Sequence, residues 1–278
     1  MKEIFHNWTV ERSIMPIKPW RRWGLPAPKS EASSGKLSLI DYEVYSGIEV
    51  HDWPFFVRLD GWAFHNLTQK LGLKKPFDRK LAAALAKCAE SLFIPFNPIL
   101  CYIFSDEASF LFTAPTSFRR IEKIDSVFAG LFSSRFGMLM NTVAAFDCRV
   151  IPVGKRNVIR YLEWRQAECS RNHNNAWAHW TMLKKAGLGS GAANERLRGL
   201  KACDLFDLCK SYGVDLGSSP VWQRHGVFLY MQKYKKYGRN PLTGKRVLVD
   251  RRRVKIDWSP PTFASSAGHA FLSSVLSG

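Results

Sequence analysis

The order of hydrophobic patterns between residues 55 and 152 constrains the fold of this chain more than any other feature. Short apolar runs typical of strands occur at 55–60, 99–104, 108–113 and 143–152. One stretch with helical spacing of apolar residues lies between the first and second runs, and another lies between the third and fourth. Asp78 and Ser117 are the expected N-caps of these two helices. This β-α-β-β-α-β order predicts an α+β domain with a ferredoxin-like sheet.

The predicted topology brings two acidic residues together. Right-handed crossovers place the third strand between the first two and antiparallel to both. The C-terminal end of the first strand then lies beside the turn that joins the second and third strands. Asp60 is at that strand end, and Asp106 is in that turn. We therefore expect both carboxylates at one rim of the sheet.

Two carboxylates at one rim suit metal-assisted phosphoryl chemistry. Mg²⁺ prefers oxygen ligands, and two such ions activate an attacking oxygen and stabilise a leaving one. A backbone carbonyl often completes the ligand set, and Gly61 lets the chain bend close to a metal. Each Asp taken singly is more typical of a turn or a helix cap, so the hypothesis depends on their meeting.

Basic residues near the predicted helix starts suit a triphosphate. Lys75 precedes the cap at Asp78, while Arg120 and Lys123 share one side of the second helix. Ser105, beside Asp106, either donates to a phosphate or only shapes the turn. A solvated helix face is the competing explanation for the basic residues.

The second half of the chain predicts helices at 158–183, 192–199 and 201–212, followed by a hairpin of strands 226–234 and 245–258. The hairpin carries ten Lys or Arg between residues 233 and 255 against one acid, and the whole chain has a formal net charge of +18. Both observations favour a polyanionic partner such as RNA. Protection of a sheet edge by charge is the alternative. The expected RNA contacts are Lys233, Lys235, Lys236, Arg251, Arg252 and Arg253.

Three regions are expected along the chain. Residues 1–36 are interrupted by four prolines and predict an extension or linker, 37–155 form the catalytic domain, and 156–278 supply helices and the hairpin. The tail after residue 259 has no informative pattern. No apolar run approaches a membrane span, and the six Cys lack zinc or disulfide spacing, so a cytoplasmic protein is expected.

A series of short motifs resembles the tRNA-His guanylyltransferase family over residues 40–200. Each motif is weak alone, but their combination and order are specific to the family. They are Arg58-Leu59-Asp60-Gly61 with Phe64-His65, Lys75-Pro76 with Asp78, Ser105-Asp106-Glu107, Phe146-Asp147-x-Arg149-Val150, and Tyr161-Leu162-x-Trp164-Arg165-Gln166-Ala167, with a weaker echo at Arg196-Leu197-x-Gly199.

The resemblance implies a polymerase-like palm that adds nucleotides to a tRNA 5′ end in the 3′-to-5′ direction, with ATP and GTP or other nucleoside triphosphates as substrates. It also implies a homotetramer built from two dimers. Asp60, the Gly61 carbonyl and Asp106 would hold two Mg²⁺ ions, Glu107 would be a further catalytic acid, and Arg165 would contact tRNA. The residues matched to nucleotide binding are Gly61, Phe64, His65, Lys75, Ser105, Arg120 and Lys123.

One segment departs from the family pattern. After Gln166, family guanylyltransferases carry a His-Ile-Asn-Asn-type run, and an alignment without gaps puts Ser170 at the position of that His. The departure resembles the "-like" branch of archaea and bacteria, which prefers templated repair of truncated tRNA 5′ ends. Arg171, Asn172 and Asn175 share a helix face that is expected to meet the nucleotide or tRNA, unless it is only a polar surface.

Templated repair is therefore the favoured function, and addition of the extra G to tRNA-His is the alternative. Two other classes remain open from the residues alone. A nucleotide cyclase-like palm enzyme would not need the basic hairpin, and a non-catalytic RNA-binding module would not need Asp60 and Asp106.

Overall fold

The structure is a computed structural model that describes residues 43, 45–114, 116 and 118–277. The expected extension at 1–36 and the expected cap Ser117 lie outside these residues. The chain divides into two compact units, one of residues 1–49 with 120–122 and one of residues 50–119 with 123–278. The second unit contains the whole sheet, and it takes in residues on both sides of the expected boundary at 155.

Six strands form one antiparallel sheet in the order β4-β1-β3-β2-β5-β6. Its first four members have the expected arrangement, since β3 lies between β1 and β2 and is antiparallel to both. The last two are the predicted hairpin, which joins the sheet through the edge of β2. The strands are β1 (Phe55–Gly61), β2 (Leu100–Phe104), β3 (Glu107–Phe112), β4 (Phe146–Pro152), β5 (Val227–Arg239) and β6 (Arg246–Asp257).

The helices of the described chain agree with the expected ones where the apolar period is long. Asp78 caps α3 as expected, because its carboxylate accepts from the Lys80 amide at 2.7 Å. The three short helices α2, α8 and α9 were not expected from the sequence. The bounds are α2 (Phe64–Lys70), α3 (Arg79–Phe96), α4 (Ile121–Met140), α5 (Val158–Lys184), α6 (Ser190–Leu197), α7 (Ala202–Ser211), α8 (Val221–His225) and α9 (Ser266–Leu276).

Helix α4 covers one face of the sheet. Its buried side chains recur at intervals of four residues, and the Phe128 ring packs against Phe110 and Phe112 of β3. Leu131, which was expected on this stripe, is instead 45% exposed because it lies beside the narrow buried row. The expected fourth strand begins at Phe146 and not at 143, and Val143 is 94% exposed.

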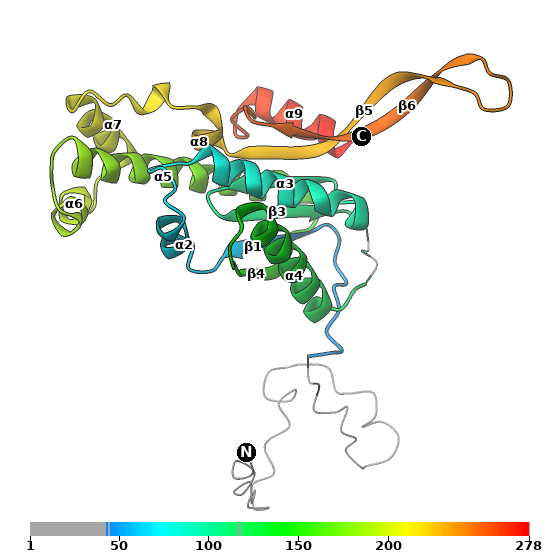
Figure 1. Cartoon of the computed structure of the whole chain (residues 1–278), viewed down its shortest axis with the longest axis horizontal. Helices are drawn as coiled ribbons and strands as arrows, with labels where there is room; N and C mark the ends of the chain where they lie inside the picture. The colour runs from blue at the N-terminus through cyan, green and yellow to red at the C-terminus, as the bar shows by residue number, and fades with distance from the viewer. Residues whose placement is uncertain (1–42, 44, 115, 117, 278) are drawn as a thin grey trace, which may run out of the picture. The chain divides into compact units, whose positions relative to one another are not determined.

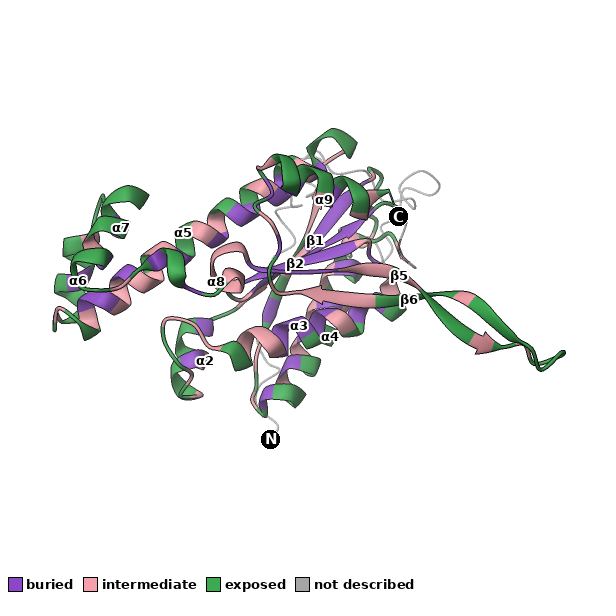
Figure 2. Ribbon diagram, turned by 90° about the horizontal axis from the view of Figure 1, so that it is seen from above, coloured by how far each residue is buried: buried purple, intermediate pink, exposed green. Residues whose placement is uncertain are grey.

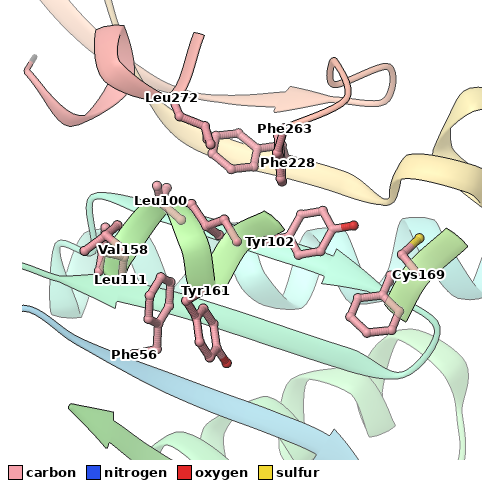
Figure 3. Packing of buried hydrophobic residues seen from close by; sticks show 12 residues of the cluster. Phe56, Leu100, Tyr102, Leu111, Val158, Tyr161, Cys169, Phe228, Phe263 and Leu272 are labelled. Atoms are coloured by element: carbon pink, nitrogen blue, oxygen red, sulfur yellow. The ribbon is translucent and has the colours of Figure 1, made fainter. Parts of the chain in front are cut away.

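Helices α5 and α9 cover the other face. Figure 3 shows the core there, where Phe56 of β1 meets Tyr161 of α5, and where Phe228 and Phe263 pack below Leu272 of α9. Figure 1 shows α9 beside β5 and β6, which then leave the body of this unit as a two-stranded arm. Figure 2 shows that this arm is almost wholly exposed, in contrast to β1 and β2.

No helix in the described part of the chain has both the length and the apolar content needed to cross a membrane.

Candidate functional site at one rim of the sheet

The rim predicted from topology is present in the structure. The pairing of β1 with β3 ends at Leu59 and Ala108, so Asp60 and the β2–β3 turn come next on neighbouring strands. Phe104 pairs with Glu107, which leaves Ser105 and Asp106 as the two turn residues. Asp60 and Asp106 are therefore brought to the same rim, although 46 positions separate them in the sequence.

The charge of Asp60 acts on Asp106. The pKa of Asp106 is raised, first because burial disfavours its charge and then because Asp60 adds a like charge, while a hydrogen bond from Ser105 acts in the opposite direction. The Ser105 hydroxyl donates to Asp106 Oδ1 at 2.9 Å. Ser105 also has a φ of 51°, a conformation that few residues with a side chain adopt. The turn thus holds Asp106 in one orientation, with negative charge gathered at the rim.

This donor set fits Mg²⁺. The ion is commonly held by one or two carboxylates together with substrate phosphates, and it keeps several of its waters. Asp60, Asp106 and the neighbouring carbonyl of Gly61 supply such hard oxygen ligands. Among the described residues, no group of three or more His, Cys, Asp or Glu side chains forms a complete metal cage.

Gly61 has a packing reason to lack a side chain. A Cβ built on Gly61 would lie 2.3 Å from the ring of Phe64. That ring is buried and packs against Phe146 at 4.9 Å between centroids. Only glycine therefore allows the chain to leave β1 and begin α2 so closely over this aromatic group.

A cavity of about 420 Å³ opens beside the Asp106 turn. It is bounded by α2, the segment before α3, the β2–β3 turn, α5 and α8. It is lined by the expected metal ligand Asp106 and by six residues expected at the nucleotide or tRNA, namely Phe64, His65, Lys75, Ser105, Asn172 and Asn175. Residues from five separate parts of the sequence are thus gathered around one space.

Lys75 brings a fixed positive charge to this cavity. Its ammonium donates to Thr68 Oγ1 at 2.9 Å, and the Thr68 hydroxyl donates in turn to the His65 carbonyl at 2.9 Å. Asp78 accepts from the Lys74 amide at 2.8 Å and from the first turn of α3. The segment before α3 is therefore tied to α2 and held against the cavity.

Glu107 and Arg165 form a buried ion pair. Glu107 accepts from Arg165 Nε at 2.9 Å and from Nη2 at 2.5 Å, and both side chains are less than one-tenth exposed. A buried guanidinium in a bidentate pair does not reach a nucleic acid at the surface, so the expectation of tRNA contact by Arg165 disagrees with the structure. Burial raises the pKa of Glu107, and Arg165 opposes this effect. The pair lies directly beneath the Asp106 turn.

Three other expected residues lie apart from the cavity lining. Arg120 pairs with Glu49 in an isolated bridge and lies 3.7 Å from Glu122, within the smaller unit. Lys123 is exposed on α4, with its ammonium 5.3 Å from the Phe118 ring. Arg171 is exposed and forms an ion pair with Glu168, whereas Asn172 and Asn175 on the same helix line the cavity.

The hairpin presents its cations to solvent as expected. Cross-strand pairs set two faces, with Gln232 opposite Arg253 on one and Lys233 opposite Arg252 on the other. Every hairpin residue expected to contact RNA is exposed, that is Lys233, Lys235, Lys236, Arg251, Arg252 and Arg253.

Two aromatic residues of the cavity were missed by the sequence analysis. Phe77 stacks on the buried ring of His173 at 5.9 Å, and Trp222 of α8 meets Phe77 edge-on at 6.3 Å. Arg79 at the start of α3 lies over the rings of Trp222 and Trp258. Phe77 could have been found from the sequence, because it directly precedes the helix cap Asp78. Trp222 could not, because α8 has only five residues and shows no periodic pattern.

Comparison with known proteins identifies the family. The family model described as tRNAHis guanylyltransferase matches residues 40–154, and the model described as Thg1 C terminal domain matches residues 156–256. The chain belongs to the tRNA-His guanylyltransferase family. The resemblance inferred from the motifs is thereby confirmed, and the members of this family are nucleotidyltransferases.

Relatives of the family extend over most of the chain. A probable tRNA(His) guanylyltransferase from Bos taurus is 28% identical over 251 residues, which cover 83% of each chain. A bacterial tRNA(His) guanylyltransferase (Thg1)-like protein solved in complex with ATP is 25% identical, with a TM-score of 0.67 over 85% of this chain and 96% of that one. The fold of a bacterial Thg1-like protein solved with GTP is also similar, with a TM-score of 0.61, 24% identity and coverage of 86% and 96%.

Proposed function

We propose that this chain adds nucleotides in the 3′-to-5′ direction to the 5′ end of tRNA, and that its preferred reaction is template-dependent repair of truncated ends. The observation that carries the proposal is the rim where Asp60 and Asp106 meet beside a cavity lined by Lys75, His65 and Ser105. Because the chain belongs to a family of tRNA nucleotidyltransferases, the proposed substrates at this rim are a tRNA and nucleoside triphosphates. The first four strands then serve as a ferredoxin-like palm.

The reaction has two transfers. The 5′-phosphate of a monophosphorylated tRNA attacks the α-phosphorus of ATP and releases pyrophosphate, which leaves a 5′-adenylylated end. The 3′-hydroxyl of an incoming nucleoside triphosphate then attacks the activated 5′-phosphate and displaces AMP. A tRNA that already carries a 5′-triphosphate enters at the second step and releases pyrophosphate in place of AMP. Solved relatives hold ATP and GTP, which are the nucleotides this scheme requires.

The protein acts mainly by positioning charged groups. Asp60, the Gly61 carbonyl and Asp106 would hold two Mg²⁺ ions, which would activate the attacking oxygen and stabilise the leaving one. Lys75, fixed by Thr68, neutralises the triphosphate, and Ser105 orients both Asp106 and a phosphate oxygen. Phe64 and His65 lie along the nucleotide, while Asn172 and Asn175 line the far wall. Glu107 and Arg165 stabilise the turn that carries Asp106, because their ion pair joins the start of β3 to α5.

Two residues of α5 favour repair over addition of G to tRNA-His. At the position of the family His, the Ser170 hydroxyl donates to the Arg224 carbonyl at 2.9 Å. His173 is buried, with Nε2 2.7 Å from Ser219 Oγ, so it does not replace that His at the cavity. The names of the relatives favour G addition, which is the second candidate.

The exposed hairpin cations Lys233, Lys235, Lys236 and Arg251 to Arg253 hold the tRNA body through its phosphates. The residues 1–36 lie outside this scheme. A homotetramer of two dimers would let one subunit's hairpin serve a tRNA held by another, and the mass of the particle in solution tests this arrangement.

The experiment that tests the function uses labelled tRNA that lacks its first 5′ nucleotide, offered with each nucleoside triphosphate in turn. We expect incorporation of only the base that is complementary to the template position. Incorporation of G alone, and only on tRNA-His, supports the second candidate. Asp60→Ala and Asp106→Ala are expected to abolish incorporation and to leave tRNA binding nearly unchanged, and full activity in either variant contradicts the assignment of the metal site.

A further inference from the structure

We propose that Trp164 is the stacking platform for the base at the RNA 5′ end. The proposal rests on the function given above and names the place where the RNA end meets the rim. Trp164 lies on α5 and is 50% exposed, which is unusual for an indole so close to a buried polar pair.

The indole is held firmly from its inner side. The Arg165 guanidinium lies 4.4 Å from the Trp164 ring centroid, and the same guanidinium is locked by Glu107. The Tyr161 ring meets Trp164 edge-on at 5.7 Å between centroids, and it stacks on Phe56 in the core at 4.1 Å. Figure 3 shows the Tyr161 and Phe56 rings side by side. A rigid aromatic ring with an open side loses little entropy when a base stacks on it.

Trp164 lies on the flank of α5 that faces the metal-holding strand. The opposite flank packs on the C-terminal segment, where Gln166 accepts from the Phe263 amide at 2.6 Å and Glu163 meets His269 at 2.6 Å. Trp164 is about 200° around the helix from Gln166. Because β5 lies on the side of that C-terminal segment, Trp164 leans over β1 and β4.

The sheet face beneath that flank is polar and open. Arg58 and Asp60 of β1 pair with Arg149 and Asp147 of β4, so all four side chains share the face on which Phe56 meets α5. Arg149 and Asp147 are about half exposed and form an ion pair at 2.6 Å. Arg58 Nε is buried and has no hydrogen-bond partner among the described residues. Such cations suit a 5′-phosphate placed between the base and Asp60.

The cavity and this face lie on two sides of the carboxylate pair. Asp106 lines the cavity, whereas Asp60 is absent from the described residues that line it and shares its face with Arg58 and Arg149. Arg149 is close enough to the rim that Asp60 and Glu107, after Asp147, raise its pKa. A nucleotide that enters from the cavity would therefore meet, at Asp60 and Asp106, an RNA end that enters along Trp164.

The test places 2-aminopurine at the 5′-terminal position of tRNA and follows its fluorescence on binding, with no nucleoside triphosphate present. We expect quenching by the natural chain and by Trp164→Phe, and its loss in Trp164→Ala. The matched control is Phe206→Ala, which removes another exposed aromatic side chain, on α7. In steady-state assays Trp164→Ala is expected to raise KM for RNA about 10-fold and to leave KM for the nucleotide unchanged.

Other results overturn the proposal. Equal quenching in Trp164→Ala, or a rise in KM for the nucleotide alone, shows that the base rests elsewhere. Dissociation of an oligomer in Trp164→Ala with quenching intact assigns the indole to a contact between copies. If the natural chain binds tRNA and adds nucleotides without quenching the probe, only this inference fails. If it does neither, the proposed function fails as well.

Discussion

The rim around Asp106 and the β5–β6 hairpin carry charge in opposite ways. At the rim, Glu107 and Arg165 are buried, and each hydrogen bond is fixed by neighbouring elements. In the hairpin, nine of the ten cations are exposed with one acid among them, and like charges such as Lys233 and Arg252 lie directly opposite each other. Facing cations weaken a strand pair, whereas a buried ion pair loses most when one partner is removed. The rim therefore holds its side chains in fixed positions, whereas the hairpin attracts anionic partners over a distance.

Removal of one partner from the buried pair should give the largest effect. Arg165→Met leaves Glu107 buried without its counter-ion, and we expect a loss of about 3–5 kcal/mol in the free energy of unfolding. Urea denaturation measures it. The control is Arg171→Met, which breaks an exposed pair and should cost at most about 1 kcal/mol. Equal losses in the two variants would remove the distinction between rim and surface.

Neutralising the hairpin should weaken RNA binding and leave the fold unchanged. In a triple variant with Arg251, Arg252 and Arg253 changed to Gln, the slope of log affinity against log salt should become shallower by about 2 to 3, close to 0.9 for each lost phosphate contact. Fluorescence anisotropy with tRNA over a salt series measures this slope. A triple Gln variant at the exposed Lys184, Lys185 and Lys210 is the control, and the same change there would indicate attraction by net charge alone.

The support of Lys75 can be loosened without removing its charge. Thr68→Val deletes the hydroxyl that accepts from the ammonium, and a hydrogen bond to a charged group contributes about 1.5–3 kcal/mol. We expect KM for the nucleoside triphosphate to rise about 10-fold, because the ammonium is no longer fixed at the cavity. Affinity for tRNA should not change. Ser211→Ala, which removes an exposed hydroxyl of α7, is the control.

The smallest predicted effect is a pH dependence of stability that arises from His173. Burial lowers its pKa, with a hydrogen bond to Asn174 acting in the opposite direction, so the folded chain favours the neutral ring. The unfolded chain then binds more protons below the ordinary histidine pKa, and stability is lost as pH falls through that range. Denaturation midpoints between pH 5 and 8 (a window set by the ordinary pKa of about 6.5) should depend less on pH in His173→Gln. An unchanged profile would assign the dependence to other groups.

The elements that could be predicted from the sequence are those with long or clear periods. The cap at Asp78, the helix from Val158 and the apolar run of β1 arise from local chemistry, so they survive in the structure. The short helices α2 and α8 depend on contacts that the sequence does not display, such as Phe64 over Gly61 and Arg79 between Trp222 and Trp258. A seven-residue or five-residue helix has too few turns to reveal its period.

In the site too, some features follow from sequence patterns and others depend on tertiary contacts. The acidic pair could be predicted because right-handed crossovers leave one way to arrange four strands. The burial of Arg165 could not, since a motif shows that an arginine is present but not which carboxylate it will meet. Its position on the buried side of α5 depends on the packing of that helix against the sheet.

Period, motif and composition are enough to predict the strand order, the family, the meeting of Asp60 with Asp106 and the charge of the hairpin. Only the folded arrangement shows which polar residues face a cavity, which are buried in the core, and that Trp164 is half-exposed. Burial depends on packing between distant segments, and the surroundings of a side chain set its chemistry.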